Sequence, residues 1–241
     1  MVEVEDGRVE GPPPLYGRLM KAIRKGHSVG NTIRMFKLPL VFTEEALYAD
    51  AIAQFYLVTA KLEEVMGRFE GSSGMLSRVK ELGLRCAPGY ASDLEELNGA
   101  AWRDQAERSM TAATRAYCDV LESSGEVELT AAAFILYGAL VVGGGKSTQA
   151  KVRKIFPRCS HKLYDVGGDM KALRADYRRT FTDIGKRWPE HFVRLEEQAA
   201  RFMALNNTVV VSIRCWGKYC NVAASVAVAL AAGAALAWSK R

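Results

Sequence analysis

The sequence predicts an all-α protein, and three observations lead to that class. Apolar residues recur every three or four positions in the segments that begin at Leu15 and Thr43, as one face of a helix requires. Helix-starting residues and breaks rich in glycine or serine divide much of the remaining chain into further helical lengths. No segment keeps the alternation of a half-buried strand, because even the apolar run at 133–142 is flanked by helix-forming residues.

Length and composition favour a single globular domain with one core. The chain has 241 residues, of which 49% are hydrophobic and 25% are charged. Its net charge of +6 favours anionic partners, but no block of five or more lysines and arginines indicates nucleic-acid binding. The five cysteines form no CxxC pair and the acidic N-terminus is unlike a signal peptide, so we expect a reduced, cytosol-facing domain.

The first helix is expected to follow a disordered leader over residues 1–14. Leu15, Leu19, Ile23 and His27 recur every four residues, which places the last three close together on one helix face. This spacing puts the histidine near the end of an apolar stripe.

The second helix is expected to start near Thr43, a residue typical of N-caps, with two glutamates behind it that suit the positive end of a helix. Its apolar positions step by three, seven, four and three residues, and a glycine-containing stretch at 71–74 should end it. The apolar face consists of Ile52, Phe55, Leu62, Met66 and Phe69.

Four more helices are expected in the domain, which should end at residue 214. A Ser-Ser-Gly turn separates the first two, a glycine pair opens the third, and a proline suits the first turn of the fourth. These helices are expected over residues 100–124, 128–156, 167–187 and 189–213.

The C-terminal segment 219–238 contains twenty residues without a charge, nine of them alanine. Twenty residues at helical rise span roughly the apolar core of a bilayer. We therefore expect a tail anchor that is inserted after translation, with the domain in the cytosol. Endoplasmic reticulum is favoured over mitochondrial outer membrane. The alternative is an alanine-rich helix that is buried against the domain.

His27 is the first candidate for chemistry. An imidazole on an apolar helix face can ligate a metal whose macrocycle packs against the same face. A lone histidine in such a place is also commonly a hydrogen-bonded core residue. Spacing alone leaves both interpretations open.

A second candidate is the run Gly143-Gly144-Gly145, which interrupts a helical segment at a cost of roughly 1 kcal/mol per glycine relative to alanine. Close approach of the backbone to a flat ligand would offset this cost. The segment 145–147 also resembles the end of a phosphate-binding P-loop, but the glycine that this motif needs five residues earlier is replaced by Leu140. A helix break without a ligand is the third interpretation.

Arg174 and Arg178 form the third candidate site. They are four residues apart on an expected helix, so they project together and suit a pair of carboxylates. A solvated helix face is the alternative interpretation.

Taken together, these features resemble the helical, biliverdin-producing heme oxygenases over about residues 15–207. The similarity includes the proximal helix that ends in the heme-ligating histidine, an aromatic stretch before Leu-Glu-Glu, and a glycine pair in the distal helix. A Tyr-Arg motif and a further helix complete it. Five segments carry the resemblance in family order: 19–27, 55–64, 144–146, 176–179 and 196–202.

The resemblance implies that heme is both cofactor and substrate and that His27 ligates its iron. It also implies a catalytic role for the backbone at Gly144 and Gly145, above the heme face where oxygen reacts. The implied products are biliverdin, carbon monoxide and ferrous iron. The implied partners are O2, an NADPH-dependent cytochrome reductase and, through the tail, membrane lipid. Further heme contacts are expected from Lys21, Gly143, Arg174, Tyr177 and Arg178, with the two arginines on the propionates.

The chain departs from the family pattern in several places, and two of them bear directly on the proposed chemistry. The family's first propionate-binding lysine falls on Met20, one position before Lys21. Its distal aspartate, which orders a water network, falls on Val141 by counting back from Gly144, with Ala139 as the rival position. A non-catalytic heme-binding or heme-sensing membrane protein is therefore the alternative function, and a helical tether without ligand is the third.

Overall fold

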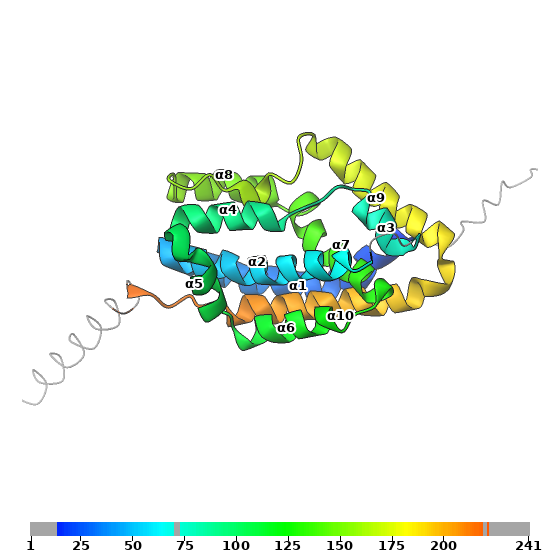
Figure 1. Ribbon diagram of the computed structural model, residues 1–241, viewed down its shortest axis with the longest axis horizontal. Coiled ribbons are helices and arrows are strands. Elements are labelled where there is room, and N and C mark those ends of the chain that lie inside the picture. The colour runs from blue at the N-terminus through cyan, green and yellow to red at the C-terminus, as the bar shows by residue number, and fades with distance from the viewer. Residues whose placement is uncertain (1–13, 70–72, 219–220, 222–241) are drawn as a thin grey trace, which may run out of the picture.

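The computed structural model of the protein describes residues 14–69, 73–218 and 221. This part of the chain is all-α and contains no strand, which confirms the expected fold class (Figure 1). The α-helices are α1 (Leu15–Val41), α2 (Glu45–Gly67), α3 (Met75–Lys80), α4 (Ala87–Asn98), α5 (Trp102–Arg108), α6 (Ala112–Glu122), α7 (Glu126–Val141), α8 (Gly145–Ile155), α9 (Met170–Arg187) and α10 (Phe192–Ser212).

α1 and α10 lie side by side and run in the same direction (Figure 1). Two glycines permit this close packing. An added Cβ at Gly26 would lie 2.8 Å from Met203 Cγ, and one at Gly30 would overlap the side chain of Asn207. The amide nitrogen of Asn207 donates a hydrogen bond of 2.8 Å to the Gly26 carbonyl oxygen. The interface with α10 therefore reaches the residue directly before His27.

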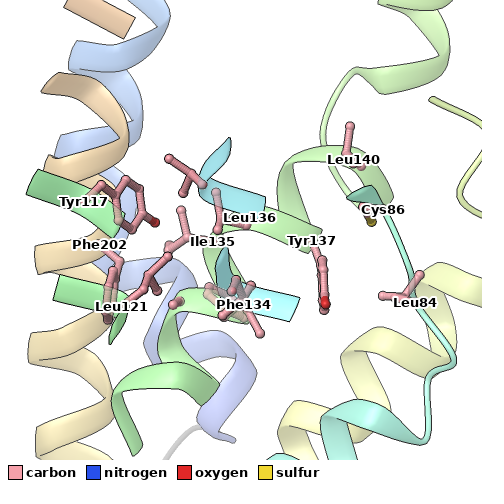
Figure 2. Packing of buried hydrophobic residues seen from close by; sticks show 14 of the residues in the cluster. Leu84, Cys86, Tyr117, Leu121, Phe134, Ile135, Leu136, Tyr137, Leu140 and Phe202 are labelled. Carbon is pink, nitrogen blue, oxygen red and sulfur yellow. The ribbon is translucent and has the colours of Figure 1, made fainter. Parts of the chain in front are cut away.

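α7 is the central helix of the core, and most of its residues are buried. Figure 2 shows Phe134, Ile135 and Leu136 between side chains of α6 and α10 on one side and residues 84–86 on the other. A helix buried on all sides needs apolar residues all round, which explains why the run 133–142 shows neither strand nor amphipathic helix periodicity.

The helix boundaries correct several expectations. α1 continues well past His27, to Val41, and carries Pro39 near its end. Thr43 is not the N-cap of α2, because its hydroxyl donates to the Leu40 carbonyl oxygen at 2.7 Å and α2 begins at Glu45. α2 also ends at Gly67, four residues before the expected stretch.

Two of the expected long helices are divided. The segment 100–124 becomes α5 and α6, and Thr111 caps the second of these by accepting a hydrogen bond from the Thr114 backbone N–H. The segment 128–156 becomes α7 and α8, which meet at an angle of 55°. α3 and α4 were not expected from the sequence, although a proline lies in the first turn of α4.

Within the described residues, no single helix has the length and apolar character that a membrane crossing needs, and only the bent pair α7 and α8 meets that test, by length and composition alone. The expected anchor at 219–238 lies outside the described residues except for Asn221, and so does the expected leader except for Pro14.

Candidate functional site

His27 lies on the surface of α1, not in the core. The residues of α1 that are buried against the rest of the domain include Leu19 and Ile23, and this stripe then passes through the glycines at 26 and 30. His27 is displaced from it and is exposed to solvent. The structure therefore rejects the interpretation of His27 as a core histidine.

The His27 ring is neutral and has one hydrogen-bond partner within α1. Its Nδ1 lies 3.3 Å from the amide nitrogen of Asn31, one turn later in α1. Partial burial, and secondly the positive charge of Arg34, lower the pKa of His27 below its usual value of 6.5. The imidazole is thus mostly neutral at pH 7, and its Nδ1 lone pair accepts from the Asn31 amide nitrogen in this structure.

The His27 face of α1 continues toward the N-terminus of that helix. At 3.6 residues per turn, Met20 and Tyr16 both point within about 20° of the direction of His27. Met20 is 40% exposed and Tyr16 is half-buried, so this face offers a mostly apolar strip with the histidine at its C-terminal end.

Lys21 does not belong to this face. It is exposed, and helical geometry directs it about 120° away from His27. The residue of the His27 face at this level of α1 is Met20, and a methionine cannot bind a propionate as a lysine does. The geometry therefore gives no support to the expected heme contact of Lys21.

α9 connects this face to the break between α7 and α8. The guanidinium of Arg178 lies over the ring of Tyr16 at 5.3 Å from the centroid. One turn earlier, Arg174 Nε donates a hydrogen bond of 2.9 Å to the Val141 carbonyl oxygen. Both arginines are exposed, so the structure places two cations between the N-terminal half of α1 and the helix break.

Tyr177, which lies between these arginines in sequence, has a different environment. Its side chain is buried, and its hydroxyl donates to the Phe134 carbonyl oxygen at 2.6 Å. An added Cβ at Gly138 would lie 2.9 Å from the same hydroxyl oxygen. Tyr177 therefore joins α9 to α7 and presents no surface to a ligand in this structure.

At two of the three consecutive glycines, the backbone of the preceding turn of α7 leaves no room for a side chain. The Gly143 N–H donates to the Gly138 carbonyl at 3.0 Å, five residues back, and a Cβ on Gly143 would overlap the Ala139 carbonyl oxygen. A Cβ on Gly145 would lie 3.0 Å from the Leu140 carbonyl oxygen. Gly144 is exposed and has open space around it, so it is the glycine at which the backbone is accessible to a ligand.

The phosphate-binding interpretation of this glycine run gains no support. Lys146 Nζ forms an ion pair with Asp165 and a hydrogen bond of 3.2 Å with Gln149 Oε1. The amine that would have to contact a phosphate is therefore already paired within the domain.

The structure also distinguishes Val141 from Ala139, the two candidate positions for the family's distal aspartate in the last turn of α7. Val141 is fully buried (0% exposed), whereas Ala139 is exposed. A side chain at position 141 points into the core, and a side chain at position 139 points out of it. The two positions carry no acid, and neither does any other residue from 129 to 145.

A buried polar cluster that was not expected from the sequence holds the connection between α8 and α9. His161 has a positive φ of 55°, its Nδ1 lies 3.1 Å from the Tyr48 hydroxyl, and its Nε2 lies 2.9 Å from the Phe156 carbonyl oxygen. Since that carbonyl only accepts, Nε2 donates and Nδ1 accepts. The buried Asp93 accepts the backbone N–H groups of Lys162 and Leu163 at 2.6 and 2.8 Å. These groups stabilise the fold.

A cavity of about 460 Å³ lies elsewhere, where α2, α5 and the end of α10 meet. Its walls are polar and include Gln54, Arg108 and Arg214. None of the candidate residues lines it, so it forms no part of the site around His27.

Comparisons with known proteins bear on the family and on the fold. The family model described as heme oxygenase matches residues 14–211. Comparison with curated proteins gives no match. Among solved structures, heme oxygenase 2 from Chlamydomonas reinhardtii, solved without heme, is 27% identical with a TM-score of 0.78, covering 86% of this chain and all of that one. Heme oxygenase-1 from the cyanobacterium Synechocystis, solved with heme, is 20% identical with a TM-score of 0.72, covering 92% of this chain and 99% of that one.

Proposed function

Because this chain belongs to the heme oxygenase family, we propose that it binds heme through His27 and cleaves it to biliverdin, carbon monoxide and ferrous iron. O2 is the co-substrate, and a cytochrome reductase that uses NADPH supplies the electrons. The observation that carries the proposal is the neutral, exposed His27 on an apolar helix face that leads to two arginines.

The described residues suit heme in polarity and in charge. Tyr16 and His27 are eleven residues apart, which is about 16 Å along α1. If heme is held at His27, Arg178 beside Tyr16 and Arg174 beside the end of α7 would be the residues that bind its carboxylates. Guanidinium groups are suited to paired carboxylate binding, and the strip between them and the histidine is apolar.

Each residue then has a distinct task. His27 would hold the iron through Nε2, which requires that the ring proton lie on Nδ1 and that Nδ1 give up its contact with the Asn31 amide nitrogen, since both groups would then be donors. Arg174 and Arg178 bind the propionates and so fix the rotation of the ring, which determines the carbon that is attacked. The exposed backbone at Gly144 allows close approach over the opposite face. When bound, heme supplies the redox chemistry at which oxygen is reduced.

A non-catalytic heme-binding or heme-sensing protein is the second candidate function. It is favoured by Ala139, because a methyl group at the exposed position of α7 can neither accept nor donate a hydrogen bond. We therefore expect ring cleavage that is detectable but slower than in relatives with a carboxylate at this place.

The test is a single-turnover reaction with full-length protein, hemin and a reducing system. We expect a Soret band typical of histidine-ligated heme, followed by its slow loss and the appearance of biliverdin. Stable heme binding without biliverdin would favour the second function. Absence of any Soret band would reject heme binding altogether.

The charge-free segment 219–238 supports the further proposal that the chain is a tail-anchored protein of the endoplasmic reticulum membrane, facing the cytosol. We expect the full-length protein to remain in the membrane pellet during extraction with alkaline carbonate. Substituting Leu230 and Leu236 by arginine should release it, because each charge in the bilayer core costs about 2.5–3.5 kcal/mol. Release of the wild-type protein would contradict the anchor.

A further inference from the structure

The outer face of α1, which points away from His27, exposes an unusual number of apolar side chains. Ten large apolar residues are exposed in the described part of the chain. Seven of them lie in the C-terminal half of α1, at the end of α10 or shortly after it: Val29, Met35, Phe36, Leu38, Leu40, Val211 and Trp216. Val29, Phe36 and Leu40 are on the side of α1 opposite His27, whereas Leu38 is on the same side as His27. Phe36 and Met35 are the most exposed, at 74% and 75%.

The N-terminal half of the same face is basic. Helical geometry places Lys21, Lys25, Val29, Phe36 and Leu40 within about 100° of arc, on the side opposite His27. Arg24 and Met35 lie between this arc and the direction of His27, about 60° and 80° from the histidine, where long side chains can reach toward the arc. Lys21, Arg24 and Lys25 are exposed and make no ion pair with any described residue. A helix face that carries free cations and exposed apolar side chains is typical of helices that lie at a membrane interface.

The C-terminal end of α1 lies next to the end of α10, from which the chain continues to the charge-free segment 219–238. Lys37 Nζ, on α1, donates to the Val211 carbonyl and, at 2.6 Å, to the Ile213 carbonyl at the end of α10. α1 and α10 end on the same side of the molecule, where the chain continues toward residue 219 (Figure 1). The charge-free segment therefore begins within a few residues of the exposed apolar patch.

We propose that the outer face of α1 binds the surface of a bilayer that contains anionic lipids. Met35, Phe36 and Leu40 insert between the headgroups, and Lys21, Arg24 and Lys25 contact lipid phosphates. The unpaired cations favour this occupant over a second copy of the chain, because two identical basic faces repel each other. In this orientation α1 lies flat on the membrane and His27 faces the cytosol, where heme and a reductase have access.

This inference rests on the proposed tail anchor only for the orientation of the domain on the membrane. One experiment distinguishes failure of the surface contact from failure of the anchor. Full-length protein with Cys215→Ser and Cys220→Ser receives a fluorescent label at Thr32→Cys, an exposed position on the outer face. The matched control carries the label at Val193→Cys, which is 62% exposed at the other end of α10. Both proteins are placed in vesicles whose lipids carry a shallow quencher, with or without about 30% phosphatidylserine.

We expect quenching at position 32 in vesicles with phosphatidylserine and none at position 193. Exchanging Lys21, Arg24 and Lys25 for glutamine should lower the ratio of docked to undocked domain about a hundred-fold, at about five-fold per charge. The same exchange at the exposed Lys151, Lys154 and Lys171 should leave the quenching unchanged. Phe36→Ser should also weaken the docking.

Several outcomes would overturn the proposal. Equal quenching at the two positions, or quenching at position 32 that ignores the three cations, would show that this face does not recognise anionic lipid. A concentration-dependent change of the label at position 32 without lipid would assign the face to a second copy of the chain. By contrast, release of the protein by carbonate together with quenching at position 32 that depends on phosphatidylserine would reject the anchor and support binding of this face to anionic lipid.

Discussion

We expect His27→Ala to remove the imidazole-type spectrum of the ferric heme complex and to stop turnover. The only ring nitrogen on the apolar strip of α1 among the described residues is lost, and nothing else in that strip is a strong iron ligand. Affinity for hemin should fall more than about a hundred-fold. Loss of a residue that only hydrogen-bonds to a metal ligand already lowers affinity roughly ten- to hundred-fold, and here the ligand itself is lost. Absorption spectroscopy and hemin titration measure both effects.

Two controls make this expectation specific. His191→Ala removes a half-exposed histidine on a different element and should leave the spectrum unchanged. Added imidazole should restore an imidazole-type spectrum to His27→Gly, because the smaller side chain leaves room for the free base. If wild type and His27→Ala give the same spectrum and affinity, His27 is not the ligand.

The second large effect is expected from two aspartate substitutions only two residues apart. Ala139→Asp places a carboxylate at the exposed position of α7, where the family resemblance implies that it would order a water beside bound heme. A hydrogen bond to a charged group contributes about 1.5–3 kcal/mol, so biliverdin formation should rise about ten- to a hundred-fold if the bond forms only in the transition state. Single-turnover hemin degradation measures this gain.

Val141→Asp should instead unfold or weaken the domain. Position 141 is fully buried, so the carboxylate would enter the core without a partner, at a cost of about 3 kcal/mol or more. In a domain of this size such a loss lowers Tm by roughly 6–12 °C. Val141→Thr, which has nearly the same shape, should cost much less in thermal unfolding.

The pair of variants tests the register as well as the chemistry. A gain of activity in Val141→Asp with unchanged Tm would mean that residue 141 faces the heme, against the burial described above. Wild-type turnover as fast as that of relatives with the acid, and unchanged by Ala139→Asp, would show that the chain needs no carboxylate here. Ala139→Asn controls for size without charge.

The sequence by itself determined the all-α class, because helical periodicity and helix-start residues depend on local chemistry alone. It also determined the start of α1 at Leu15, the end of α9 at Arg187 and the order of the candidate residues along the chain, whereas the start of α9 at Met170 is three residues later than the expected glycine pair. Local rules did not place every boundary. Thr43 has the chemistry of an N-cap, yet its hydroxyl binds the end of α1, because the contact available in the folded chain competes with the cap.

Only the tertiary structure decided which side chains face a ligand. Periodicity aligned His27 with Ile23, but the close approach of α10 at Gly26 and Gly30 moves the buried stripe away from the histidine and leaves it exposed. In α7 nearly every residue is apolar, so spacing could not distinguish Val141 from Ala139. The neighbours that bury one side chain and leave the other at the surface come from distant parts of the chain, and a pattern along one helix does not contain them.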